Sequence, residues 1–132
     1  MIDTKLARLP RVLFVDDDEL MRRCLRRSLQ EVAEVFAAGS AEEGHALLCV
    51  MTFDVVVSDY ALADGDGLAL LASASRVQPA SKRALLSGHE PTVEARQALA
   101  QGLLDAVLRK PDGLFELVRI VRGCTDGARA AS

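Results

Sequence analysis

Residues 55–60 read Val-Val-Val-Ser-Asp-Tyr, and the Gly/Asp-rich segment Ala-Asp-Gly-Asp-Gly follows at residues 63–67. A short run of β-branched apolar residues bounded by turn residues is typical of a buried strand in a parallel sheet. Open α/β sheets place their ligand sites at the carboxyl ends of such strands. The sequence therefore predicts a central strand whose end carries a functional carboxylate, that of Asp59.

Three further apolar runs end in chemically active side chains in the same way. The run at 11–15 is followed by Asp16, Asp17, Asp18 and Glu19, the run at 82–86 by Ser87 and Gly88, and the run at 104–108 by Arg109, Lys110 and Pro111. The carboxyl ends of parallel strands meet at one edge of a sheet. We therefore expect the acids, the hydroxyl and the amine to lie close together and to form the functional site.

The segments between these runs have the patterns of helices. Helices are expected at about residues 19–29, 40–51, 68–75, 91–101 and 112–122, and a weaker, alternating strand at 32–37. Five strands that alternate with five helices favour a parallel sheet joined by right-handed crossovers. The expected architecture is a three-layer α/β sandwich, whose strand order does not follow from periodicity.

Local signals place the ends and faces of several helices. Asp18 suits the N-cap of the first helix, and Ser40 with Glu43 has the spacing of a capping box for the second. Pro91 suits the first turn of the fourth helix, and Gly102 suits its C-cap. The side chains of the second helix that are expected to face the core are Ala46, Leu47 and Val50.

Length and composition are those of one globular domain. The chain has 132 residues, of which 50% are apolar and 27% charged. Its net charge of -3 argues against direct binding of nucleic-acid phosphates, and the arginines at 22, 23, 26 and 27 are interpreted as the solvated side of an amphipathic helix. No stretch approaches the roughly 20 apolar residues of a membrane span, and residues 1–5 lack the apolar core of a signal peptide. A cytoplasmic location is expected.

The cysteines and histidines do not form a recognisable metal or disulfide pattern. Cys24, Cys49 and Cys124 are odd in number and lack CxxC spacing, so we expect free thiols in a reducing compartment. His45 and His89 have no His or Cys partner at ligand spacing. Both histidines are expected to lie at the surface.

Taken in order, these residues resemble a response-regulator receiver domain, the phosphoacceptor module of two-component signalling. The resemblance covers about residues 10–122 and rests on Asp16-Asp17-Asp18 after the first strand, Asp59, the Asp66-Gly67 turn, Ser87-Gly88 and Lys110-Pro111. It implies a flavodoxin-like (βα)5 fold with a parallel sheet of order 2-1-3-4-5. It also implies a single domain, similar to a chemotaxis regulator, which is expected to span residues 1–132. The residues at 123–132 are small and polar, so a flexible tail is expected there.

The resemblance implies a covalent chemistry for Asp59. Its carboxylate would take a phosphoryl group from a sensor histidine kinase or a histidine phosphotransfer protein and form an acyl phosphate. Lys110 would pair with one phosphoryl oxygen, and Ser87 would donate its hydroxyl to another. The domain would assist its own phosphorylation and dephosphorylation without being an enzyme for a separate substrate. In this family the Lys-Pro bond is commonly cis, which the resemblance extends to Lys110-Pro111.

A divalent cation, Mg2+ or Mn2+, is also implied by the resemblance. Asp17, Asp59 and the backbone carbonyl of Ala61 would bind it directly, and Asp16 would bind it through water. Magnesium prefers oxygen ligands and keeps several of its waters. Clustered carboxylates repel one another without a cation, which by itself argues for a metal.

The segment after Asp59 departs from the family pattern. It usually reads Met-Pro before the Asp-Gly turn, whereas Leu62-Ala63 stands here, and the loop is expected to be looser without the proline. Ala61 stands where a polar residue often tunes hydrolysis of the phosphoryl group. The lifetime of the phosphoryl group therefore does not follow from the sequence.

The output side of the domain departs from the pattern as well. Val107 stands where a Tyr or Phe usually swings between buried and exposed states, which a valine cannot do. We therefore expect the signal to pass through Ser87, the loop after it and the helix at 91–101. The resemblance places the docking surface on that helix, the next strand and the last helix. Leu103, Leu104 and Val107 are expected to add exposed apolar area there.

Two alternatives belong to other classes. Asp16-x-Asp18 after an apolar strand matches the nucleophile motif of haloacid-dehalogenase-type phosphatases, but no acidic motif at a strand end follows Lys110, as that family requires. A pseudo-receiver would dock on partners without phosphorylation, although the acids and the lysine are intact. Within the receiver interpretation, the chain is either a stand-alone protein that acts on an unknown downstream protein or a fragment of a regulator or kinase with a fused effector domain.

Overall fold

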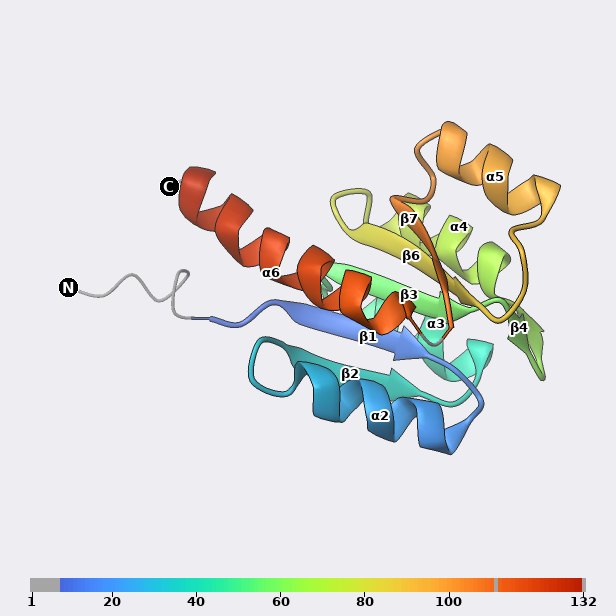
Figure 1. The fold of residues 1–132 in the computed structure, drawn as a ribbon, viewed down its shortest axis with the longest axis horizontal. Helices are drawn as coiled ribbons and strands as arrows, with labels where there is room; N and C mark the ends of the chain where they lie inside the picture. Colours follow the sequence, from blue (N-terminus) through green and yellow to red (C-terminus); the bar gives the residue numbers. More distant parts are fainter. Residues whose placement is uncertain (1–7, 111, 132) are drawn as a thin grey trace.

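The apolar runs of the sequence form one parallel sheet in the computed structural model, which describes residues 8–110 and 112–131 (Figure 1). Its strands are β1 (Arg11–Val15), β2 (Glu34–Ala38), β3 (Val55–Asp59), β6 (Lys82–Ser87) and β7 (Ala106–Arg109). They lie in the order β2-β1-β3-β6-β7, and all neighbours are parallel. This is the order 2-1-3-4-5 of successive sheet strands, so the expected flavodoxin-like fold is confirmed.

Helices cover both faces of the sheet. They are α2 (Glu19–Leu29), α3 (Ala41–Val50), α4 (Gly67–Val77), α5 (Val93–Ala100) and α6 (Gly113–Ala131). Alternate residues of a strand point to opposite faces, and in β1 Val12 and Phe14 pack with α2 and α6, whereas Leu13 and Val15 pack with α3, α4 and α5. All four side chains are fully buried. The three-layer sandwich follows from strands that are apolar on both faces.

The predicted N-caps are present, but one helix begins later than expected. Asp18 accepts a hydrogen bond from the amide of Leu20, and Ser40 caps α3. Helix α5 begins at Val93, and its N-cap is Thr92, which leaves Pro91 outside the helix. A threonine at the N-cap satisfies a free amide of the first turn, which a preceding proline does not do. Gly102 follows α5 with a φ of 82°, as expected for a helix end.

The buried face of α3 differs from the prediction. Its buried residues are Ala41, Gly44 and Leu48, whereas Val50 is 75% exposed and Ala46 is also exposed. A Cβ on Gly44 would lie 2.9 Å from Val15 Cγ2, so the glycine allows α3 to pack closely on β1. The spacing of hydrophobic residues does not mark a glycine as a core residue. The prediction therefore selected the wrong face of α3 as the buried one. The expectation for Leu47 was better, since it is partly buried against the core.

Helix α6 continues beyond its predicted end. It was expected to stop near Arg122, but it runs to Ala131, so the expected tail is helical over most of its length. The small and polar residues after Arg122 predicted a frayed tail, whereas the alanines among them are strong helix formers. The expectations for the lead-in before Arg8 and for a cis Lys110–Pro111 bond concern Met1–Ala7 and Pro111, which lie outside the described residues.

The Gly/Asp-rich segment, expected to be a loop, contains a small hairpin. β4 (Ala61–Leu62) and β5 (Gly65–Asp66) pair antiparallel around the two-residue turn Ala63-Asp64. The hairpin lies beside the carboxyl end of β3 (Figure 1). It is therefore part of the edge of the sheet at which the candidate site residues were expected.

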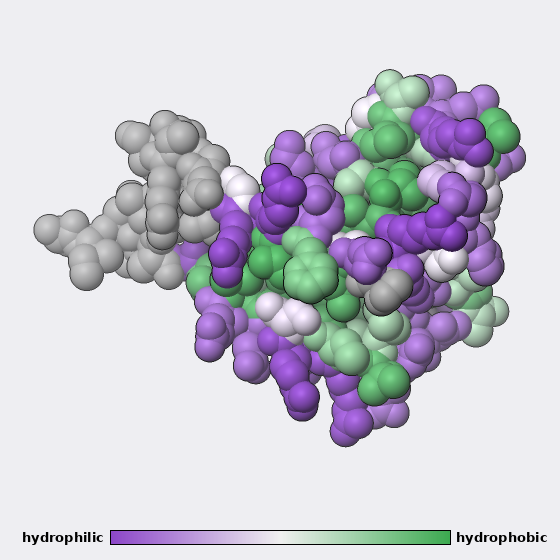
Figure 2. Space-filling model, viewed as in Figure 1, coloured by the Kyte–Doolittle hydropathy of each residue, from purple (hydrophilic) through white to green (hydrophobic). Residues whose placement is uncertain are grey.

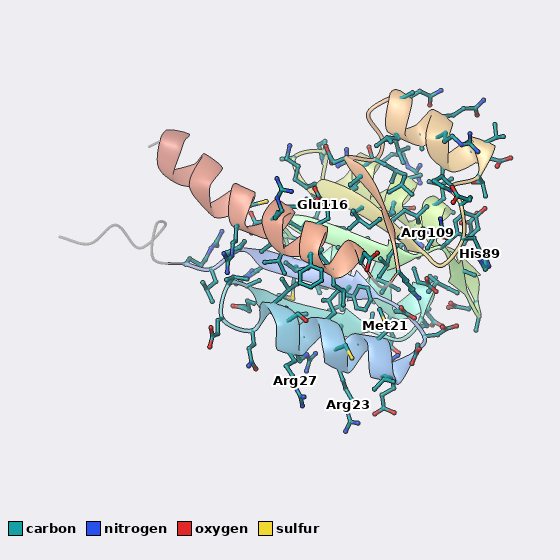
Figure 3. The ribbon with its side chains drawn as sticks, viewed as in Figure 1. Met21, Arg23, Arg27, His89, Arg109 and Glu116 are labelled. Carbon is teal, nitrogen blue, oxygen red and sulfur yellow. The ribbon has the colours of Figure 1, made fainter. Side chains whose placement is uncertain are left out.

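The face shown in Figure 2 carries many hydrophilic side chains and an apolar area between α2 and α6. Phe115, at the start of α6, is 80% exposed. Arg23 and Arg27 point away from the sheet (Figure 3), in agreement with the predicted solvated side of α2. The same prediction is wrong for Arg22, which is half-buried and donates a hydrogen bond to the Asp16 carbonyl. Cys24 and Cys49 are exposed and unpaired, and burial raises the pKa of the half-buried Cys124 thiol. None of the described helices combines the length and the apolar composition that crossing a membrane requires.

Candidate functional site

Three predicted acids meet at the carboxyl edge of the sheet. Asp16 follows β1, Asp17 is in the loop to α2, and Asp59 is the last residue of β3. The parallel register pairs Val15 with Ser58, which places Asp16 beside Asp59. One carboxylate oxygen from each of the three acids lies within 4.8 Å of the others. The fold thus brings together acids that are separated by more than 40 positions in the chain.

Lys110 lies among these acids, as predicted. Its Nζ is 3.0 Å from Asp59 Oδ1 and 3.4 Å from Asp16 Oδ2. Its backbone amide donates to the carbonyl of Ser87, so the end of β7 is held against the end of β6. The ammonium group is therefore fixed next to the carboxylate that the sequence singled out.

Ser87 is buried at the end of β6, one residue beyond Leu86, which pairs with Asp59 in the sheet. Its Oγ accepts a hydrogen bond of 3.1 Å from the amide of His89. A hydroxyl has two lone pairs and one proton, so this bond leaves the Ser87 O–H able to donate. His89 itself is exposed on the loop after β6 (Figure 3), and His45 is exposed as well.

Burial and charge act in opposite directions on the ionisable groups of the site. Asp16 has no solvent exposure, and burial raises the pKa of its carboxyl group, with the charge of Asp59 adding to the effect. Burial alone would lower the pKa of Lys110, but the hydrogen bond to Asp59 and the charges of both acids outweigh it, and the pKa is raised. The lysine therefore stays protonated at neutral pH, and its ammonium group is shared by Asp59 and Asp16.

The donor set suits a hard divalent cation. The ligand atoms that Asp16, Asp17 and Asp59 offer are carboxylate oxygens, which Mg2+, Ca2+ and Mn2+ prefer. Burial, and after it the negative charge of Asp59, raises the pKa of Asp16, so a cation bound beside the two carboxylates would favour their charged forms. Ala61, whose carbonyl was predicted to be a further ligand, is the first residue of β4, two positions after Asp59. The residues present therefore fit the predicted cation.

Gly67 holds a close backbone contact beneath the acceptor candidate. A Cβ at this position would lie 1.9 Å from the carbonyl oxygen of Asp59 and 2.8 Å from Ser58 Oγ. The Gly67 amide donates to the carbonyl of Tyr60, and Asp66 caps α4 through the amide of Leu68. The Asp66-Gly67 motif is thus needed to pack the start of α4 against the end of β3.

Sequence reasoning did not identify Asp64 as a residue of this region. Its carboxylate accepts hydrogen bonds from the amides of Ala41 and Glu42 at the start of α3, and these bonds lower its pKa. The neighbouring Ala63 amide donates to Asp17. These contacts join positions more than 20 residues apart, and no local spacing signals them.

Comparison with known proteins gives the family. The family model "Response regulator receiver domain" matches residues 12–122, most of the chain. The chain belongs to this family. A CheY-like receiver domain protein from Methanospirillum hungatei has a solved structure similar to this receiver domain. The TM-score is 0.82 at 27% identity, over 94% of this chain and 99% of that one.

Two further matches bear on this receiver domain. A response regulator from Burkholderia pseudomallei, solved with a phosphorylated aspartic acid, a calcium ion and citrate, matches with a TM-score of 0.76 at 25% identity, over 92% of this chain and 72% of that one. The C4-dicarboxylate transport transcriptional regulatory protein DctD of Rhizobium meliloti is 29% identical over 94% of this chain and 27% of that protein. The chain spans between 25% and 55% of the length of the curated relatives that it matches first.

The raised pKa of Asp16 predicts a pH dependence of the metal-free receiver domain. A carboxyl group whose folded pKa is raised binds more protons in the folded state, so stability is lost as the pH rises from the unfolded pKa, about 4, through the folded pKa. In Asp16→Asn the free energy of unfolding should not fall in this way as the pH rises. The variant should therefore be more stable than the parent at pH 7. The free energy of unfolding is measured with urea in the presence of EDTA between pH 4 and pH 7. Asp112→Asn is the control, because Asp112 is an exposed acid. Parallel profiles of parent and Asp16→Asn would contradict the prediction.

Proposed function

We propose that this receiver domain accepts a phosphoryl group on Asp59 from a sensor histidine kinase or a histidine phosphotransfer protein, with Mg2+ or Mn2+ bound at the acids. The observation that carries the proposal is the position of the Lys110 ammonium group, 3.0 Å from Asp59 in a cluster of three carboxylates. The phosphorylated aspartic acid of the Burkholderia pseudomallei response regulator, a member of the same fold at 25% identity, supports it.

Each site residue has a proposed part in the transfer. An oxygen of Asp59 attacks the phosphorus of a phosphohistidine, the phosphorus–nitrogen bond breaks, and its electron pair returns to the imidazole. Lys110 and the Ser87 hydroxyl hold two oxygens of the phosphoryl group, because this reaction depends mainly on positioning and on neutralising charge. Asp16, Asp17, Asp59 and the carbonyl of Ala61 would hold the cation. When bound, the cation supplies further neutralisation of the phosphoryl oxygens.

The proposal extends to the role of the whole domain. The domain is a phosphoacceptor that assists its own phosphorylation and dephosphorylation and has no separate substrate. We propose one cytoplasmic domain over residues 1–132 with a core at about 10–122. Its output is a downstream protein or a fused effector domain. Transcriptional regulatory proteins are among the longer relatives, which supports a fused effector domain as the output.

The uptake of a phosphoryl group is the test of this function. The protein is incubated with acetyl phosphate or phosphoramidate, with Mg2+ or with EDTA, and its intact mass is measured. A gain of one phosphoryl group with Mg2+ and none with EDTA is expected. No gain with any donor, metal or time would contradict the function and would favour the phosphorylation-independent pseudo-receiver.

Removal of the site lysine should slow this uptake strongly. Lys110→Ala is expected to lower the rate of phosphoryl uptake by about 100-fold. Removing one positioned hydrogen-bond donor from a charge that develops in the transition state typically slows a reaction by this factor or more. The parent and the variant are compared by the initial rate of mass gain at saturating Mg2+. Lys82→Ala is the matched control, because Lys82 is exposed at the start of β6, the far end of that strand. Equal rates for the parent and Lys110→Ala would remove the lysine from the mechanism.

The docking face proposed for output is α5, β7 and α6, but the prediction that Leu103, Leu104 and Val107 are exposed there is wrong for all three. Leu104 is only 2% exposed, and Leu103 and Val107 are partly buried against the core. Leu103 and Leu104 lie between α5 and β7, and Val107 lies within β7. All three pack with the core cluster, so apolar character indicated burial and not exposure. We propose that the signal passes from Ser87 through its loop to α5.

This path predicts where a phosphoryl mimic changes the structure. Amide NMR signals of residues 87–102 should shift when beryllofluoride and Mg2+ are added to the parent protein. The Asp59→Asn variant treated in the same way serves as the control for non-specific effects. A complete absence of shifts in residues 87–102, with shifts around Asp59, would exclude the path.

A further inference from the structure

The turn Ala63-Asp64 of the β4–β5 hairpin is bonded to two distant parts of the chain. The Ala63 amide donates a hydrogen bond of 3.0 Å to Asp17 Oδ2. The two carboxylate oxygens of Asp64 accept bonds of 2.8 Å from the amide of Ala41 and 3.1 Å from that of Glu42. A two-residue turn therefore connects an acid of the candidate metal site with the N-terminus of α3.

Asp64 anchors this turn to the start of α3. The first amides of a helix lack partners within the helix, and a carboxylate at this end is also favoured by the helix dipole. Ser40 satisfies the amide of Glu43, and Asp64 satisfies the two amides before it. The two residues thus share the capping of α3, but only Asp64 also belongs to the hairpin that follows Asp59.

The bond from Ala63 to Asp17 depends on a departure of this chain from its family. A proline usually stands at the position of Ala63 in the proteins that the sequence resembles, and a proline has no amide proton to donate. The alanine supplies that donor. A carboxylate has about four lone-pair positions, so Asp17 keeps oxygen sites for a cation while one is bonded to Ala63.

We propose that Ala63 and Asp64 are positioning residues for Asp17. The Ala63 amide orients the Asp17 carboxylate, and Asp64 holds that amide in place by binding the start of α3. Hydrogen bonds to ligand side chains fix their orientation, and their loss typically weakens metal binding by 10- to 100-fold. The inference deepens the proposed function and depends on it, because it assigns the loop after the acceptor a part in assembling the Mg2+ site.

The affinity for Mg2+ can be measured without any phosphoryl transfer. The chain has one tyrosine, Tyr60, next to Asp59, and no tryptophan, so tyrosine fluorescence reports on the site during a Mg2+ titration. The variants are Ala63→Pro, which removes the amide donor without a change of charge, and Asp64→Ala. The matched controls are Ser40→Ala, which removes the other cap of α3, and Glu42→Gln, which removes one nearby negative charge.

Ala63→Pro and Asp64→Ala are each expected to weaken Mg2+ binding by about tenfold. This is the low end of the range because both residues of the Ala63–Asp17 bond are exposed. Ser40→Ala and Glu42→Gln should keep the parent's affinity, although Ser40→Ala should lower the midpoint of thermal unfolding as Asp64→Ala does. A fold check by circular dichroism accompanies each titration.

A second measurement does not need a metal at all. In the metal-free parent the Ala63 amide should exchange with solvent more slowly than in Asp17→Ala and Asp64→Ala, as followed by NMR. Equal exchange in all three proteins would overturn the inference. So would parent-like Mg2+ affinity in both Ala63→Pro and Asp64→Ala, or an equal loss of affinity in Ser40→Ala.

The failure of this inference is separable from a failure of the proposed function. If the parent binds Mg2+ and takes up a phosphoryl group while Ala63→Pro and Asp64→Ala bind Mg2+ equally well, only the inference is wrong. If the parent shows neither Mg2+ binding nor phosphoryl uptake, the proposed function is wrong, and the inference is wrong with it.

Discussion

Replacement of Gly67 by alanine is expected to lower the free energy of unfolding by at least about 3 kcal/mol, the upper part of the range for overpacked sites. The added Cβ would lie 1.9 Å from the carbonyl oxygen of Asp59, which is backbone and cannot rotate away. Relief of the clash requires α4 or the end of β3 to move. The midpoint of thermal unfolding should fall by about 10 °C or more.

Gly88→Ala is the matched control for this experiment. No atom lies within 4 Å of the position that a Cβ on Gly88 would take, and the residue is exposed on the loop after β6. Urea unfolding of the two variants and the parent measures the difference. A Gly67→Ala variant as stable as Gly88→Ala would show that the contact under Asp59 is loose, contrary to the structure described here.

Much of the candidate site was predictable because its residues follow apolar strands directly. Asp16, Asp17, Asp59 and Lys110 each stand within two residues of a strand end, and a parallel sheet brings such ends to one edge. Their convergence needed only the strand order, which came from the family resemblance. The role of Gly67 was visible as a motif, but its reason, a backbone contact with Asp59, was not.

The features that sequence reasoning missed depend on packing between distant segments. The side of α3 that faces the core is set by Gly44, whose small size matters only because Val15 lies against it. Asp64 binds amides that are 22 and 23 positions away, so no local spacing could reveal it. Helix α6 extends to Ala131 through a segment whose small and polar residues, considered locally, predicted a frayed tail.

Asp59→Asn is expected to abolish phosphoryl uptake completely. The amide keeps the size of the side chain but is a poor nucleophile, and it cannot form an acyl phosphate. Asp59 is also the acid that Lys110 approaches most closely, at 3.0 Å, which concentrates positive charge where the phosphoryl oxygens would gather. The fold should be retained, because an asparagine can still accept the hydrogen bond from the lysine.

Asp16 is the rival acceptor, as in a haloacid-dehalogenase-type phosphatase. Its side chain is 1% exposed, compared with 15% for Asp59, and one of its oxygens already accepts the amide of Asp18. A donor molecule would therefore reach Asp59 more easily than Asp16. Asp16→Asn should still gain a phosphoryl group, at a lower rate, because only a ligand of the cation is altered.

The intact mass of the parent, Asp59→Asn and Asp16→Asn after incubation with phosphoramidate and Mg2+ tests the central claim most directly. We predict a gain of one phosphoryl group in the parent and in Asp16→Asn, and none in Asp59→Asn. A gain that persists in Asp59→Asn and disappears in Asp16→Asn would contradict the account and make Asp16 the acceptor.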